Sequence, residues 1–125
     1  MRIIAGNLKG SSLYLPKDKN TRPLRDLTKE SIFNLLTHSK KILLELKKSN
    51  VLDLYAGTGS FGLECVSRQA KSVYFIESKK NVIEILEKNI EKLKVKNKIK
   101  IFFDDIFELI KKQDISESKF DLIFL

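Results

Sequence analysis

The glycines and the acid of the stretch VLDLYAGTGSFG, from Val51 to Gly62, are the residues of this sequence best suited to hold a ligand. Gly57, Gly59 and Gly62 have the Gly-x-Gly-x-x-Gly spacing of a turn between a strand and a helix. Glycine is needed where the chain bends sharply and a nucleotide-like ligand touches the backbone, so a Cβ at Gly57 or Gly59 is expected to occupy ligand space. The turn residues expected to contact the ligand are Tyr55, Ala56, Gly57, Thr58 and Gly59.

Asp53 distinguishes between the two ligands that such turns hold, a nicotinamide dinucleotide and S-adenosylmethionine. It lies inside the apolar run VLDLY, where an unpaired carboxylate would cost several kcal/mol. A dinucleotide brings phosphates to the turn, and the carboxylate would repel them. S-adenosylmethionine presents an ammonium and a sulfonium, which an acid complements. Asp53 therefore favours S-adenosylmethionine, and the alternative is that it pairs with a nearby lysine or backbone amide.

Two further acids follow the next apolar runs. Glu77 ends SVYFIE, at the expected carboxyl edge of the neighbouring strand, where it can accept hydrogen bonds from two ribose hydroxyls. NAD makes the same contact, so Glu77 indicates adenosine binding without identifying the cofactor. Asp105 follows IKIFF, and two interpretations are open: it binds an adenine amino group, or Asp104 or Asp105 caps a helix.

The positive charge is concentrated before the glycine turn. Residues 1–50 contain 11 lysines and arginines against 4 acids, a net +7 of the total +8. This segregation favours a polyanionic partner, with a solvated lysine-rich surface as the alternative. The residues expected to contact such a partner are Arg2, Lys9, Arg22 and Arg25.

Length and composition exclude several other classes of protein. A chain of 125 residues with 42% apolar residues forms at most one domain with its own core. No apolar run approaches the about 20 residues that span a bilayer, and the basic start has no signal-like segment, so a cytoplasmic protein without a membrane partner is expected. Cys65 has no partner for a disulfide or a zinc site, so no metal is expected, and His38 is expected to be solvated.

Four apolar runs, VLDLY, SVYFIE, IKIFF and FDLIFL, alternate with segments of helical spacing from residue 51 onward. This order predicts β-α-β-α-β-α-β, with parallel strands covered on both faces, which is the doubly wound α/β class. Between the second and third runs, a helix beginning at a Ser78 cap is expected to expose lysines and bury one stripe. The stripe consists of Val82, Ile83, Leu86, Ile90 and Leu93.

The first 50 residues are expected to add a β-hairpin and a helix. RIIAG and SLYLP flank the turn-prone GNLKGS, which predicts a small hairpin that projects from the core. A helical pattern from about Thr28 to Lys48 follows. Its expected buried stripe is Ile32, Leu35, Leu36, Leu43 and Leu46.

Taken together, MRIIAGNLKGSSLYLP, TRPLRD, SIFNLL, VLDLYAGTGSFGLE, VYFIE and FDLIFL closely resemble the RsmD-type bacterial 16S rRNA (guanine-N2)-methyltransferases. The glycine turn alone would fit most S-adenosylmethionine-dependent methyltransferases. The more specific features are the opening RIIAG…G, Arg22-Pro23 and Phe33-Asn34. The resemblance implies a Rossmann-like methyltransferase fold, a basic hairpin that meets RNA, and methylation of the exocyclic N2 amine of a guanine in 16S rRNA or the 30S subunit.

In this family the strand resembling FDLIFL leads directly into an Asp-Pro-Pro-aromatic motif, which would hold the guanine amine and stack the base. Here the chain stops at Leu125, so no catalytic residue is expected within it. We expect an RNA-contacting extension over residues 1–50 and the N-terminal part of an incomplete cofactor-binding domain over 51–125. Such a chain is expected to be inactive by itself and marginally stable, or dimeric through its unpaired sheet edge.

Two other functions are consistent with part of the sequence. A fragment of an NAD-dependent dehydrogenase would explain the glycine turn and Glu77, but Asp53 and the basic N-terminal residues oppose it. A non-catalytic RNA-binding module would explain the charge. Cofactor titration distinguishes a dehydrogenase from a methyltransferase, and a methyl-transfer assay distinguishes a non-catalytic RNA-binding module from a methyltransferase.

Overall fold

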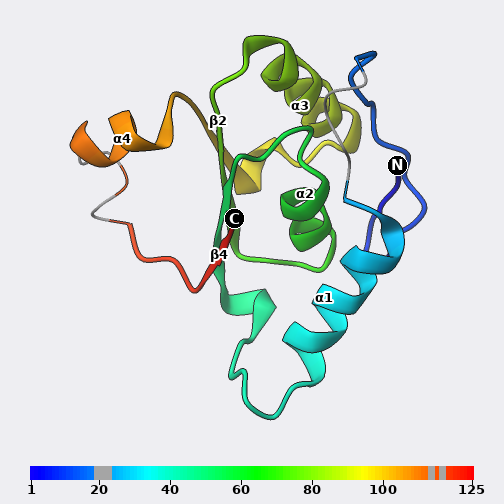
Figure 1. Cartoon of the computed structure of the whole chain (residues 1–125). Helices are drawn as coiled ribbons and strands as arrows, with labels where there is room; N and C mark the ends of the chain where they lie inside the picture. The colour runs from blue at the N-terminus through cyan, green and yellow to red at the C-terminus, as the bar shows by residue number, and fades with distance from the viewer. Residues whose placement is uncertain (19–23, 113–114, 116–117) are drawn as a thin grey trace.

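A four-stranded parallel sheet forms the centre of the molecule (Figure 1). The computed structural model describes residues 1–18, 24–112, 115 and 118–125. The strands lie in the order β3-β2-β1-β4, and their bounds are β1 Asn50–Leu54, β2 Ser72–Glu77, β3 Ile99–Phe103 and β4 Leu122–Phe124. The connecting helices are α2 Ser60–Ser67, α3 Lys80–Leu93 and α4 Ile106–Lys112. The predicted β-α-β-α-β-α-β order and doubly wound class are therefore confirmed.

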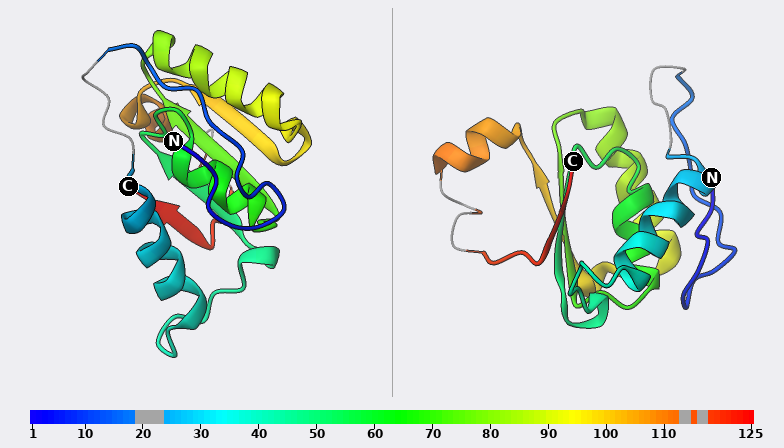
Figure 2. Two further views of the ribbon diagram at one scale, coloured as in Figure 1. Left: turned by 90° about the vertical axis from the view of Figure 1, so that its right-hand side faces the viewer. Right: turned by 60° about the horizontal axis from the view of Figure 1, so that its bottom comes forward.

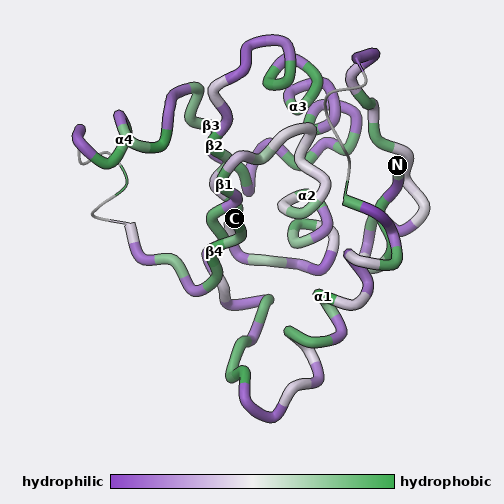
Figure 3. The backbone as a smooth tube through the Cα atoms, in the orientation of Figure 1, coloured by the Kyte–Doolittle hydropathy of each residue, from purple (hydrophilic) through white to green (hydrophobic). Residues whose placement is uncertain are grey.

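Helices cover both faces of the sheet. Figure 2 shows the sheet edge-on, with α4 on one side and α1, α2 and α3 on the other. The larger core contains Val51, Val73 and Phe75 beneath α2 and α3, while Leu52, Ile76 and Leu109 form a smaller cluster with α4. Hydrophobic residues accordingly concentrate on the central strands, and hydrophilic ones on the outer turns of α3 (Figure 3). Alternate residues of each strand thus enter different cores.

The helix α3 buries the predicted stripe. Its buried apolar residues are Val82, Ile83, Leu86, Ile90 and Leu93. The predicted cap is wrong, because Lys79 occupies the N-cap position and makes no side-chain capping bond. Glu77 accepts hydrogen bonds from the amides of Ser78 and Lys79, which are the two residues that lead into α3.

The first helix is shorter than predicted. Helix α1 covers Asp26–His38, and a separate 3-10 turn covers Leu46–Lys48. The chain becomes extended at Ser39, whose hydroxyl accepts a hydrogen bond from the Lys41 amide and so competes with helix continuation. The predicted stripe is correct in part, since Ile32, Leu36 and Leu46 pack partly buried against the main core. It is wrong at Leu35 and Leu43, which are 59% and 98% exposed, and it missed Lys29 and Phe33, which α1 buries fully.

The first 14 residues form a minimal hairpin that lies against α2. One antiparallel bridge joins Arg2 to Ser12, and backbone hydrogen bonds join Ile3 to Ser11 and Leu13 to Met1. The expectation that this hairpin projects from the core is wrong, because Ile3 and Leu13 are buried members of the main core. Their burial compensates for the small number of hydrogen bonds in the hairpin.

The last strand lies beside the first, as the usual order of such sheets predicts. Leu122, Ile123 and Phe124 pair in register with Val51, Leu52 and Asp53. Phe124 also stacks on Phe61 of α2, with ring centroids 3.8 Å apart. In the described residues, β4 has β1 as its only neighbour in the sheet. No helix in the described part is long and apolar enough to cross a membrane.

Candidate functional site

The connection from β1 to α2 is a tight turn with an unusual backbone. Tyr55, Gly57 and Gly59 all have positive φ, of 53°, 57° and 87°. A left-handed conformation suits glycine but strains an aromatic residue, and such strain is concentrated at functional sites. The Tyr55 side chain is 60% exposed. The strand β1 and helix α2 therefore hold the predicted ligand-contacting turn in a fixed and strained shape at the carboxyl edge of the sheet.

The three glycines stand at the predicted turn, but the physical reason that requires glycine differs from one position to the next. The nearest neighbour of a Cβ on Gly57 would be the Tyr55 carbonyl oxygen at 4.0 Å, so this side of the turn is open among the described residues. A Cβ on Gly59 would lie 2.5 Å from Leu86 Cδ1, which means that Gly59 faces the core and the expectation of ligand space there is wrong. At Gly62 a Cβ would lie 2.2 Å from Phe75 Cε1, so this glycine permits close packing of α2 on β2.

Asp53 lies below this turn with its carboxylate buried. Its side chain accepts a hydrogen bond of 2.9 Å from the Gly62 amide. Gly62 is the third residue of α2, so its amide has no acceptor within the helix. Asp53 therefore makes the backbone contact that the sequence left open as an alternative, and its cofactor contact stays a prediction. Burial, opposed by the Gly62 bond and assisted by the nearby Glu77 charge, raises the pKa of Asp53 to about 8.

Glu77 connects β2 to the turn. Its carboxylate accepts hydrogen bonds from the amide of Gly57 at 3.0 Å and from those of Ser78 and Lys79 at 2.9 Å each. The structure thus places Asp53 and Glu77 on adjacent strands, at the two sides of the turn, as their order in the sequence predicts. The proposed ribose contact of Glu77 stays a prediction.

Asp105 lies at the start of α4, beyond the end of β3. Its carboxylate accepts a hydrogen bond of 2.8 Å from the Phe107 amide, so it caps this helix. The neighbouring Asp104 binds the Lys112 ammonium at 2.8 Å, and this hydrogen bond lowers the pKa of Asp104. The capping interpretation is therefore realised in the structure, while an adenine contact of Asp105 stays a prediction.

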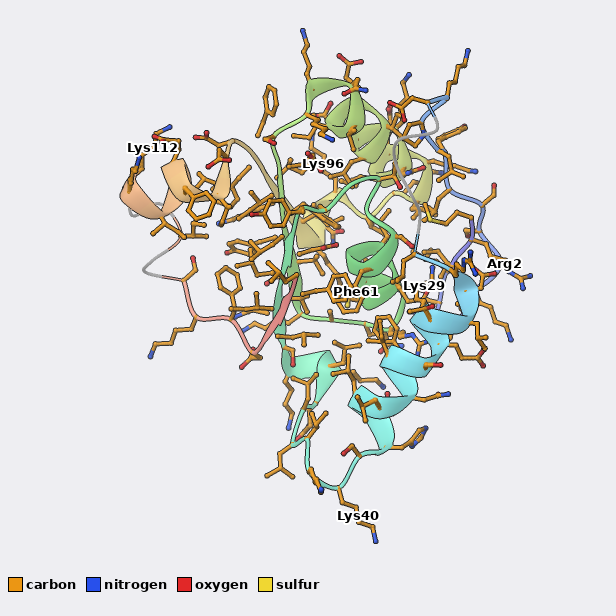
Figure 4. The ribbon with its side chains drawn as sticks, viewed as in Figure 1. Arg2, Lys29, Lys40, Phe61, Lys96 and Lys112 are labelled. Carbon is orange, nitrogen blue, oxygen red and sulfur yellow. The ribbon has the colours of Figure 1, made fainter. Side chains whose placement is uncertain are left out.

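The predicted RNA contacts lie on the N-terminal side of the molecule. Arg2, Lys9 and Arg25 are exposed, and Arg2 forms an ion pair with Asp26 at 3.0 Å. Figure 4 shows Arg2 at the outer edge of the molecule, on the opposite side from Lys112. A groove of about 450 Å³ includes Arg2, Lys9 and Arg68 in its lining. Arg22 lies outside the described residues.

Sequence reasoning missed a buried ion pair that anchors the N-terminal segment. Lys29 of α1 and Glu64 of α2 are both fully buried, and their charged atoms lie 3.3 Å apart. Glu64 also accepts hydrogen bonds from the Ile4 and Ala5 amides at 2.9 Å, and Lys29 donates to the Arg2 carbonyl at 2.7 Å. Lys29 extends from α1 toward α2 in Figure 4. An acid inside the apolar segment FGLECV was the signal that could have shown it.

A second missed residue is Asn89, which is fully buried in α3 and bonded to Thr58 of the turn. Its position between Leu86 and Ile90, on the apolar face of the helix, was the available signal. In the described part of the chain, no cluster of three or more histidine, cysteine or acidic residues is arranged to hold a metal ion.

A doubly wound parallel sheet, with a glycine turn after β1 and acids at the ends of β1 and β2, defines the Rossmann-like class of cofactor-binding domains. The model of one protein family, described as conserved hypothetical protein 95, matches residues 1–125. The chain belongs to this family, which is the RsmD type that its motifs resemble.

Several characterised or solved proteins are similar to the chain. Ribosomal RNA small subunit methyltransferase D of Haemophilus influenzae is 36% identical over 125 residues, covering 100% of this chain and 62% of the relative. The protein of that name from Buchnera aphidicola subsp. Baizongia pistaciae is 34% identical over 100% of this chain and 59% of its own. The solved structure of Escherichia coli yhhF superposes with a TM-score of 0.74 at 28% identity, covering 88% of this chain and 55% of that one. The chain thus spans about three fifths of the length of these curated relatives.

Proposed function

We propose that the chain is the cofactor-binding portion of an S-adenosylmethionine-dependent methyltransferase that acts on ribosomal RNA. The observation that carries this proposal is the buried Asp53 carboxylate beneath the glycine turn, in a chain whose relatives are named as rRNA methyltransferases. Following the family resemblance, the proposed methyl acceptor is the exocyclic N2 amine of a guanine in 16S rRNA or the 30S subunit. A protein with this substrate would act in the cytoplasm.

The residues of the site fit the proposed cofactor. A carboxylate whose pKa is raised to about 8 by burial gains from a cation placed beside it, because the cation favours the ionised form. The open side of Gly57 leaves room for a ligand against the backbone. In this proposal Asp53 holds the cationic amino-acid end, Glu77 the ribose hydroxyls and Asp105 the adenine amino group. When bound, the cofactor would supply the methyl group.

We assign residues 51–125 to the cofactor-binding domain and residues 1–50 to an RNA-contacting extension that shares its core. The charge of +7 in the extension and the exposure of Arg2, Lys9 and Arg25 support the second assignment. Because the chain covers about three fifths of its relatives, methyl transfer is to be assayed with a form extended through the Asp-Pro-Pro-aromatic motif of the family as well as with the chain itself.

The cofactor proposal predicts selective binding in a calorimetric titration. S-adenosylmethionine and S-adenosylhomocysteine are expected to bind, while NAD is not, because NAD brings phosphates to the turn and no cationic amino-acid end to pair with the buried Asp53. The titration is to be run on the chain and on its extended form under the same conditions. Binding of NAD without detectable binding of either methyl-cycle ligand would overturn the proposal in favour of a dehydrogenase.

The RNA proposal predicts a steep salt dependence that originates in the extension. Removing one phosphate contact, as in Lys9→Gln or Arg25→Gln, is expected to flatten the slope of log affinity against log salt by about 0.7–0.9. A matched control is Lys111→Gln on α4, which removes the same charge from the opposite face of the sheet. The measurement is the binding of a 16S rRNA fragment between low and physiological salt. An unchanged slope in Lys9→Gln and Arg25→Gln would place the RNA surface elsewhere.

A further inference from the structure

Asn89 is a polar residue with three tertiary hydrogen bonds in the middle of an otherwise apolar helix face. Its Oδ1 accepts from the Tyr14 amide at 2.7 Å, and its Nδ2 donates to the Tyr14 carbonyl at 3.2 Å and the Thr58 carbonyl at 3.0 Å. Asparagine is a poor helix former, and burying its amide is unfavourable unless it is hydrogen-bonded. The tertiary partners of Asn89 therefore account for its presence in α3.

These partners belong to two separate parts of the chain, and Asn89 bonds to both. The extension also reaches the end of the turn by a second, longer contact, from the Lys29 ammonium to the Ser60 hydroxyl at 3.4 Å. Tyr14 lies in the N-terminal extension, 75 residues before Asn89, whereas Thr58 lies in the glycine turn. Leu86, three residues before Asn89, contacts the same turn, because a Cβ on Gly59 would lie 2.5 Å from its Cδ1. One face of α3 thus holds the turn through an apolar contact from Leu86 and a hydrogen bond from Asn89. The same Asn89 amide also bonds Tyr14 of the extension.

The other side of Tyr14 is accessible. Its side chain is 51% exposed, and the Lys92 ammonium lies 4.8 Å from the ring centroid. Lys92 also donates a hydrogen bond to the Ser12 carbonyl at 2.7 Å. A hollow of about 870 Å³ lies here, and four lysines outnumber two acids among the residues that line it with Tyr14: Lys17, Lys88, Lys92, Lys94, Glu84 and Glu91. An aromatic ring among lysines suits a single-stranded nucleotide, whose base can stack while its phosphate is neutralised.

We propose that Asn89 is a positioning residue that links the N-terminal extension to the cofactor turn, so that RNA bound beside Tyr14 and S-adenosylmethionine bound at the turn stabilise each other. The proposal rests on the proposed function for the identity of the two ligands. A ligand that orders Tyr14 also orders its two hydrogen bonds to Asn89, and the same amide holds the Thr58 carbonyl. By linkage, a ligand at the turn tightens RNA binding by the same factor.

The first test needs no ligand and compares hydrogen exchange in the wild-type chain and in Asn89→Ala. We expect faster exchange in two separate segments, residues 12–16 and residues 55–60, because the variant loses the amide that bonds both. Asn89→Leu is the second variant, to be used if the alanine form is unfolded. Leucine fills the space of the asparagine side chain but lacks the amide that bonds Tyr14 and Thr58, so residues 12–16 and 55–60 are again both expected to exchange faster.

Ser67→Ala is the matched control. Ser67 is equally buried and also binds the extension, since its hydroxyl accepts from the Leu8 amide at 2.9 Å and donates to the Ala5 carbonyl at 2.6 Å. It has no hydrogen bond to the turn among the described contacts. This variant is expected to loosen residues 5–9 without changing exchange in residues 55–60.

The second test measures ligand binding. Asn89→Ala is expected to bind S-adenosylhomocysteine about tenfold more weakly than wild type, and Ser67→Ala within about twofold of it. Saturating 16S rRNA fragment is expected to tighten S-adenosylhomocysteine binding about fivefold in wild type and in Ser67→Ala, but not in Asn89→Ala. If Asn89 only stabilises the fold, its replacement by alanine would lower stability, but RNA would still tighten S-adenosylhomocysteine binding.

The two proposals fail in distinguishable ways. If wild type binds neither S-adenosylhomocysteine nor RNA, the proposed function is wrong, and the exchange experiment still decides whether Asn89 links the two segments. If ligands bind but Asn89→Ala accelerates exchange in only one segment, or keeps the fivefold mutual effect, the link through Asn89 is wrong.

Discussion

Asp53→Asn is expected to weaken S-adenosylmethionine binding roughly 10- to 100-fold, the loss of one buried charge-assisted contact. Asparagine has nearly the same shape and its carbonyl can still accept the hydrogen bond from the Gly62 amide, so the turn and α2 should keep their structure. Calorimetry gives the affinity, and circular dichroism confirms the fold. Asp121→Asn is the control, because Asp121 accepts a backbone hydrogen bond from Asn50 at the amino edge of the sheet. Unchanged affinity in Asp53→Asn would leave Asp53 with its structural role alone.

The raised pKa of Asp53 adds a pH dependence to this result. Because the folded pKa of about 8 exceeds the ordinary value of 3.8, the folded state binds more protons than the unfolded state between these pH values. Stability from this group is therefore greatest below pH 3.8 and is lost as the pH rises toward 8, by at most about 1.4 kcal/mol per unit. Asp53→Asn removes this loss, so its stability relative to wild type should improve from pH 5 to pH 8. If the amide group introduced by Asp53→Asn lacks a hydrogen-bond partner, it would lower the stability of the variant by the same amount at every pH, so the dependence of the stability difference on pH would not change.

Cofactor affinity in wild type should rise over the same range. A cation beside Asp53 favours the ionised carboxylate, so binding releases a proton and the affinity should increase by up to about tenfold per pH unit below pH 8. Asp53→Asn should lose this dependence. Titrations in two buffers of different ionisation enthalpy measure the proton release directly, and wild-type binding without it would contradict an ionised Asp53 in the complex.

Glu64→Ala is expected to cost about 3–5 kcal/mol of unfolding free energy, the largest stability effect we predict. The substitution leaves the fully buried Lys29 ammonium without its carboxylate, and it also removes the acceptor for the Ile4 and Ala5 amides. Urea unfolding measures the loss. Replacing both partners, as in Lys29→Met with Glu64→Leu, should recover part of it, because the buried Lys29 ammonium is then absent. The recovery should be incomplete, because the largely buried Arg68 guanidinium, 3.0 Å from Glu64, still loses its carboxylate.

The exposed ion pair of Glu45 and Lys48 provides the comparison. Their charged atoms lie 2.9 Å apart, closer than those of Lys29 and Glu64, but the side chains are 72% and 78% exposed. Glu45→Ala should therefore cost at most about 1 kcal/mol. If the two alanine substitutions have equal effects, burial does not determine the importance of Glu64, and the other contacts of the N-terminal extension are sufficient to hold it.

Local patterns in the sequence predicted the central part of the fold. The alternation of apolar runs with helical spacing gave the order of strands and helices, and the stripe from Val82 to Leu93 identified the buried face of α3. The spacing of Gly57, Gly59 and Gly62 located the turn. These features were predictable because they depend on residues a few positions apart, whose periodicity and backbone freedom the sequence states directly.

The same reasoning failed where a local preference competed with a distant contact. The leucine-rich segment after α1 has helical spacing, but the chain leaves the helix at Ser39 and exposes Leu43. The short hairpin looked too small to be stable, and it is buried through Ile3 and Leu13. Hydrophobic spacing identifies a face that could be buried, whereas packing determines which face is buried.

At the candidate site, the local pattern was enough to identify the turn residues and to place Asp53 and Glu77 on adjacent strands. The partners of the polar atoms depend on the folded chain: Asp53 bonds to Gly62, Glu77 to Gly57, and Asn89 to both Tyr14 and Thr58. A buried polar group must find a partner, and this requirement is visible in the sequence. The identity of that partner depends on which distant segments the packed helices and sheet bring within hydrogen-bonding distance, and no local pattern records it.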